Sequence, residues 1–76
     1  MKEVLEVIAK SLVENPDDVN ITEIENDEGS LTLELRVADG DMGKVIGKQG
    51  RIAKAIRTVV KAAASREDKH VSVDIM

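Results

Sequence analysis

The sequence predicts an α+β domain in which three helices cover one face of a three-stranded mixed sheet. Three observations predict this fold. Two stretches repeat apolar residues at helical spacing, three stretches alternate apolar and polar residues as strands do, and a long helical connection separates the second strand from the third. The predicted order is helix, strand, strand, helix, helix, strand. With 76 residues, the chain has room for a single domain over 1–76.

The first half reads as a helix followed by a β-hairpin. Residues 3–14 carry an apolar stripe, and Asn15-Pro16 ends this helix because the residue before a proline is pushed out of helical geometry. Residues 19–25 are rich in β-branched side chains and alternate imperfectly. Residues 31–37 alternate cleanly, which predicts a half-buried strand whose other face is open to water. The polar turn Asn26–Ser30 joins the two strands.

The second half reads as two helices and a final strand. Asp41 is expected to cap a short helix over 42–46 through its side chain. A longer helix over 51–64 places basic residues opposite an apolar stripe, and a strand over 71–75 follows through a right-handed crossover. The expected members of the stripe are Ile52, Ala55, Ile56, Val59, Val60 and Ala63.

The composition excludes several classes of function. The chain has no Cys, Phe, Trp or Tyr, which rules out a disulfide framework, a cysteine zinc site, a thiol nucleophile and stacking of aromatic rings on bases. His70 is the single histidine, and no catalytic constellation accompanies it. We therefore expect no enzyme, no metal site and no cofactor. No apolar run approaches the roughly 20 residues that span a bilayer, so we expect a soluble, cytoplasmic protein with no membrane contact.

Charge is distributed unevenly along the chain. The net charge of −4 argues against a nucleic-acid partner, but residues 1–40 hold 3 basic and 11 acidic side chains, whereas residues 41–76 hold 8 and 4. A domain that is acidic overall can still present one basic face to phosphate. A solvated helix face would carry the same charges, so charge alone leaves both interpretations open.

The segment Val45-Ile46-Gly47-Lys48-Gln49-Gly50-Arg51 carries the functional hypothesis. Two glycines three residues apart allow a sugar–phosphate backbone to approach the main chain, where the N–H groups and dipole of the following helix attract an anion. The spacing fits neither a P-loop nor a dinucleotide-binding fingerprint. The alternative is that Gly47 caps one helix and Gly50 only permits the turn into the next.

This segment resembles the GXXG signature of KH domains. The element order matches the type II KH topology, αββααβ, over essentially the whole chain, and the length and the run GKVIGKQGRIAKAIRTVVKAA resemble the small bacterial KhpA family of single-KH RNA-binding proteins. The resemblance implies a loop that clamps about four nucleotides of single-stranded RNA over an aliphatic floor. Ile46 is the candidate floor residue, with a core position as the alternative. The implied RNA-binding residues are Lys44, Ile46, Gly47, Lys48, Gln49, Gly50, Arg51 and Lys54.

The KhpA resemblance also implies partners and a cellular role. It implies an RNA chaperone or post-transcriptional regulator that forms a homodimer, or a heterodimer with a larger KH protein of the KhpB/Jag type, and that is linked to cell shape and cell wall biogenesis. Ala53 departs from the branched aliphatic residue common at this place in KH domains, which suits close approach of another helix. Asp27 and Glu28 would lie in the loop expected to wall the groove, where acids oppose phosphate. A protein–protein adaptor with little RNA affinity is therefore the alternative function.

Overall fold

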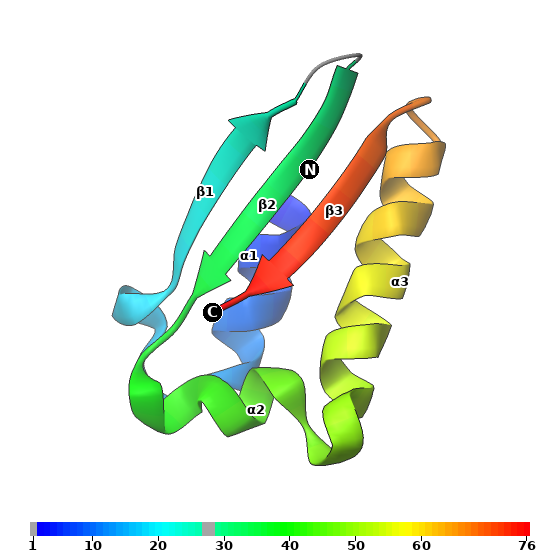
Figure 1. Cartoon of the computed structure of the whole chain (residues 1–76). Helices are drawn as coiled ribbons and strands as arrows, with labels where there is room; N and C mark the ends of the chain where they lie inside the picture. Colours follow the sequence, from blue (N-terminus) through cyan, green and yellow to red (C-terminus); the bar gives the residue numbers. More distant parts are fainter. Residues whose placement is uncertain (1, 27–28) are drawn as a thin grey trace.

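A three-stranded sheet carries the helices on one face (Figure 1). The computed structural model describes residues 2–26 and 29–76, so Asp27 and Glu28 of the predicted turn lie outside the described residues. α1 lies behind the sheet in Figure 1, α2 crosses its lower end, and α3 runs alongside β3. The elements are α1 (Lys2–Leu12), β1 (Asn20–Glu25), β2 (Ser30–Arg36), α2 (Met42–Ile46), α3 (Arg51–Ser65) and β3 (His70–Ile75).

The sheet has the predicted mixed topology. β2 is the central strand, β1 pairs with it antiparallel, and β3 pairs with it parallel. The parallel pairing follows from the connection, because α2 and α3 carry the chain back to the end at which β2 starts. Within the described residues, no helix is both long and apolar enough to cross a membrane.

The alternation of β2 sets the layers of the domain. Leu33 and Leu35 are fully buried beneath the helices, and β3 adds Val71 and Val73 beside them. Thr32 lies on the opposite face between Ser72 of β3 and the exposed Ile24 of β1, which confirms the expectation of a sheet open to water on one side. This alternation does not extend through β1, where Ile21 is half-buried and the other five residues are exposed.

The buried face of α3 differs from the predicted stripe. Ile56 and Val60 are buried as expected, but Ala55 is exposed and Val59 is 50% exposed. The prediction that Ala55 and Val59 are covered was wrong, because α3 packs chiefly against β3 and its core face is turned toward that strand. The buried residues of α3 are Ala53, Ile56, Val60 and Ala64.

Asp41 does not cap α2, contrary to the sequence prediction. Its side chain makes no cap hydrogen bond and is instead 1% exposed. Oδ1 accepts the N–H of Glu14 at 3.1 Å, and Oδ2 accepts the N–H of Asn15 at 3.0 Å and its Nδ2 at 3.1 Å. Backbone donors just beyond the end of a helix need an acceptor, and Asp41 supplies it. The carboxylate therefore ties the chain leaving α1 to the start of α2.

Candidate nucleic-acid interface

The loop between α2 and α3 is a tight turn built on its two glycines. The N–H of Gly47 donates to the carbonyl of Gly43 at 2.8 Å, and the N–H of Gly50 donates to the carbonyl of Gly47 at 3.2 Å. The N–H of Arg51 donates to the carbonyl of Lys48. Both glycines have positive φ, 76° at Gly47 and 74° at Gly50. Residues with a Cβ rarely adopt such angles, so the conformation explains why glycine stands at both ends.

The two glycines differ in what lies above them. A Cβ on Gly47 would lie 2.5 Å from Cγ1 of Ile52, so the main chain there is already packed against the first turn of α3. A Cβ on Gly50 would meet nothing within 4 Å. The alternative of a purely structural glycine therefore describes Gly47, which is the C-cap of α2. Gly50 also agrees with that alternative, because its positive φ favours glycine, but it leaves open space beside the start of α3.

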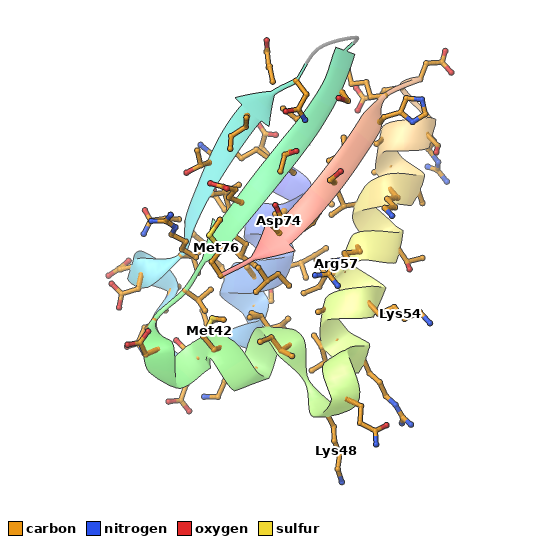
Figure 2. All side chains as sticks on the ribbon, in the orientation of Figure 1. Met42, Lys48, Lys54, Arg57, Asp74 and Met76 are labelled. Carbon is orange, nitrogen blue, oxygen red and sulfur yellow. The ribbon has the colours of Figure 1, made fainter. Side chains whose placement is uncertain are left out.

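The two middle residues of the loop project into solvent. Lys48 and Gln49 are exposed, and Lys48 extends away from the body of the domain (Figure 2). Gln49 has a left-handed backbone, with φ 59° and ψ 25°. Strained conformations of non-glycine residues persist where the surroundings hold them, and they cluster at binding sites. The loop thus presents one ammonium group and one amide at the outer end of the domain.

Ile46 lies directly before the loop and outside the core. Its side chain is 36% exposed, while the preceding Val45 is fully buried. It is also absent from the described apolar residues that pack against the core cluster. Of the two roles considered for Ile46, the core position is therefore not the one observed. An apolar surface remains beside the loop.

The ammonium group of Lys44 is engaged by acids. Its Nζ lies 2.7 Å from Oε1 of Glu14 and 3.7 Å from Oδ1 of Asp41. The hydrogen bond to Glu14 is the largest influence, and it outweighs burial to raise the pKa of Lys44 above its ordinary value. Lys44 therefore stays charged at neutral pH, but two carboxylates already offset that charge. It remains a predicted RNA contact with less free charge than Lys48.

The basic residues of α3 divide between two flanks of the helix. Lys54, Arg57 and Lys61 recur at spacings of three and four and therefore share one face. The Nε of Arg57 donates to the carbonyl of Val73 at 3.2 Å, which turns this face toward β3. Arg51 lies on the other flank, where it lines a groove facing α1. The structure thus brings residues 46–51 together at one end and places Lys54 one turn further along.

Two features of the described surface were not expected from the sequence. An apolar groove of about 450 Å³ runs between α1 and α3 and is lined by Ile8, Leu12 and Val59 among others. A polar hollow of about 350 Å³ lies between the far end of α3 and β3. The helical spacing of the apolar residues could have indicated the groove. It gives α3 more apolar residues than one buried face can cover. No group of three or more acidic or histidine residues in the described chain is placed to hold a metal ion.

Comparison with known proteins finds a matching family model and several similar relatives. The family model of the KhpA/KhpB KH domain matches residues 2–75. The RNA-binding protein KhpA of Clostridium perfringens is 64% identical over 76 residues, covering 100% of both chains. The protein of that name from Clostridium acetobutylicum is 63% identical with the same coverage, and that from Aquifex aeolicus is 47% identical over 100% of this chain and 95% of its own.

Solved structures agree on the fold. Era of Aquifex aeolicus bound to GDP and aluminium fluoride superposes with a TM-score of 0.61 at 21% identity, over 97% of this chain and 30% of that chain. Era in complex with MgGDPNP and a segment of 16S ribosomal RNA gives a TM-score of 0.52 at 23% identity, with the same coverage. The chain therefore spans less than a third of the length of Era, and the likeness concerns the fold. The predicted KH fold is confirmed.

Proposed function

This chain belongs to the KhpA/KhpB family of KH domains, and from that premise we propose that it binds single-stranded RNA, with residues 47–50 as the clamp on the RNA backbone. The family is one of RNA-binding proteins and not of enzymes. The observation that carries the proposal is the loop itself, with open space above Gly50 and two exposed polar side chains beside it. A clamp of this kind holds about four nucleotides.

The neighbouring residues support a path for the strand. Phosphate groups sit over Gly50 at the start of α3, where the helix dipole favours negative charge, and Lys48 and Arg51 neutralise them. Bases lie on the exposed side chain of Ile46. Lys54 extends from α3 one turn beyond the loop (Figure 2). In this path its ammonium group neutralises the next phosphate. Backbone contacts of this kind carry little sequence information, so we propose modest sequence preference.

The double variant Lys48→Asp/Gln49→Asp is expected to weaken RNA binding by roughly tenfold or more, because it loses charged hydrogen bonds and adds repulsion. The measurement is fluorescence anisotropy with short single-stranded RNAs at several salt concentrations. For the intact protein, the logarithm of affinity should fall with the logarithm of salt concentration by about 0.7 per phosphate contacted. Circular dichroism confirms that each variant is folded.

The matched control for this variant is Lys10→Asp/Ser11→Asp, which makes the same change in charge at two exposed positions of α1. The control should bind RNA nearly as well as the intact protein does. Equal losses in both variants would mean that net charge and not the loop governs binding. If the folded intact protein binds no RNA, the adaptor function replaces RNA binding.

We also propose that a second KH chain covers the apolar groove between α1 and α3, either another copy of this chain or a larger KhpB/Jag-type protein. The groove is lined almost wholly by apolar side chains, and Val59 at its rim is 50% exposed. Small domains bury a limited fraction of their surface, so covering such a groove adds stability. In this pair the protein serves in the cytoplasm as an RNA chaperone or post-transcriptional regulator linked to cell shape.

Val59→Asp is expected to abolish association while leaving the fold intact, because the new carboxylate enters an apolar contact that is solvent-exposed in the single chain. Sedimentation equilibrium reports self-association, and titration of a KhpB-type protein reports the mixed pair. The control is Thr58→Asp, which places the same charge on a neighbouring exposed residue. A sedimentation profile and a titration that the Val59 variant leaves unchanged would exclude this groove as the interface.

A further inference from the structure

We infer that RNA held at the loop continues along α3 into a second anion-binding hollow, between the far end of that helix and β3. The inference rests on the proposed RNA binding and extends its site. The hollow has a volume of about 350 Å³. Lys61 and Ser65 of α3 line one side of it, and Lys69, His70 and Ser72 line the other.

The lining of this hollow suits a phosphate group. It combines two ammonium groups with an imidazole and hydroxyl donors, and the described lining residues include no carboxylate. Neither Lys61 nor Lys69 forms an ion pair with the described acids. Ammonium and hydroxyl groups that converge on one space are the donors that phosphate oxygens accept. In a chain with a net charge of −4, two neighbouring ammonium groups that pair with none of the described acids favour an anion in this hollow.

A second depression next to the hollow indicates on which side of Lys69 the RNA passes. It is lined by Glu23 and Glu25 of β1, and Lys69 also contributes to it. Lys69 therefore stands between an acidic depression and the hollow whose described lining lacks a carboxylate. The carboxylates of the depression repel an RNA phosphate, and the ammonium groups of the hollow attract it. The strand therefore passes Lys69 on the side of the hollow.

The loop and the hollow lie on one continuous basic face. Lys54, Arg57 and Lys61 follow each other at helical spacing, and Ser65 continues the same face. The hydrogen bond from Arg57 to the carbonyl of Val73 keeps this face beside β3. The apolar groove lies on the other flank of α3, so a strand on the basic face and a protein partner on the groove share only Arg51, which lines the groove beside the loop.

The distance sets the length of RNA required. Residues 51–65 of α3 rise by about 21 Å at about 1.5 Å per residue. A stacked strand with a rise of about 3.4 Å per nucleotide covers that distance with roughly six nucleotides. Because the loop alone holds about four nucleotides, the hollow is reached only by longer RNA.

The test compares single-stranded RNAs of about four and about ten nucleotides by fluorescence anisotropy. The variant is Lys61→Gln/Lys69→Gln, which removes both ammonium groups and keeps polar side chains of similar length. The control is Lys10→Gln/Arg66→Gln. It removes the same charge, and Arg66 lies at the same end of α3 on the opposite flank.

The expected result is a loss of roughly tenfold in affinity for the longer RNA in the variant, with the affinity for the shorter RNA unchanged. For the longer RNA, the slope of the logarithm of affinity against the logarithm of salt concentration should also become shallower by about 1.4. This change corresponds to the loss of two phosphate contacts. The control should retain affinity for both RNAs. Equal affinity of the intact protein for both lengths, or equal losses in variant and control, overturns the hollow while the clamp stands. Failure of the intact protein to bind either RNA overturns both.

Discussion

Replacing Gly47 by alanine is expected to destabilise the domain by roughly 2–6 kcal/mol, because two separate costs add at this position. With φ 76° and ψ 176°, the backbone lies in a region that is almost exclusive to glycine. The new methyl group would also lie 2.5 Å from Cγ1 and 2.8 Å from Cβ of Ile52, so the first turn of α3 must shift. A domain of 76 residues has about 4–11 kcal/mol to lose, so this variant approaches the limit of folding.

Urea unfolding monitored by circular dichroism measures the effect against two matched substitutions. Gly50→Ala meets open space and bears only the cost of a left-handed backbone, about 1–2 kcal/mol. Gly43→Ala sits inside α2 with nothing within 4 Å of the new methyl group, and should gain up to about 1 kcal/mol from helix propensity. The expected order of stability is therefore Gly43→Ala, the intact protein, Gly50→Ala, Gly47→Ala. Equal effects at Gly47 and Gly50 would show that contact with Ile52 contributes nothing.

The contrast between the two glycines bears on the function of the loop. If RNA lies over Gly50, then Gly50→Ala loses affinity by obstructing the strand in a protein that still folds. Gly47→Ala loses affinity because the loop itself is distorted. Under the proposed function, the fold requires Gly47, whereas Gly50 serves both the left-handed turn and the approach of the RNA backbone.

The loop and the order of elements could be predicted because they depend on local chemistry. Alternation in residues 31–37 and the glycine spacing are visible without knowledge of the rest of the chain. The covered part of α3 could not be predicted in the same way. Periodicity marks Val59 as apolar, but only the placement of α3 against β3 decides that it stays half exposed.

Long-range contacts account for the remaining differences. A local capping rule predicts that Asp41 caps α2, yet its partners are Glu14 and Asn15, which lie 27 and 26 residues away in sequence. The basic hollow also depends on a long-range contact. Lys61 and Lys69 line one space because β3 returns beside α3. Within the part of the chain that the structure describes, Asp41 is the buried polar or charged residue. No pattern of spacing signals such a residue.

Asp41→Asn is expected to lower the melting temperature more than Asp39→Asn does, although both substitutions remove one negative charge. The carboxylate of Asp41 accepts hydrogen bonds from three N–H groups, shared between its two oxygens. An asparagine has one acceptor oxygen, and its amide group would oppose a backbone donor in a buried site. Asp39 lies in the same turn and is exposed, so it serves as the matched control. Thermal unfolding by circular dichroism at neutral pH measures both variants.

The dependence of stability on pH distinguishes the ionised carboxylate from a merely well-packed side chain. Burial acts to raise the pKa of Asp41, but the N–H of Glu14, both donors of Asn15 and the charge of Lys44 outweigh it, so the pKa is lowered. A lowered pKa stabilises the folded state fully above the ordinary value of about 3.9, and this contribution is lost as the pH falls through the folded value. The gap in melting temperature between the intact protein and Asp41→Asn should therefore be constant from about pH 5 to 7 and narrow below about pH 4. If the difference in melting temperature between the two proteins stayed the same down to about pH 2, the shape of the Asp41 side chain and not its charge would stabilise the chain beyond α1.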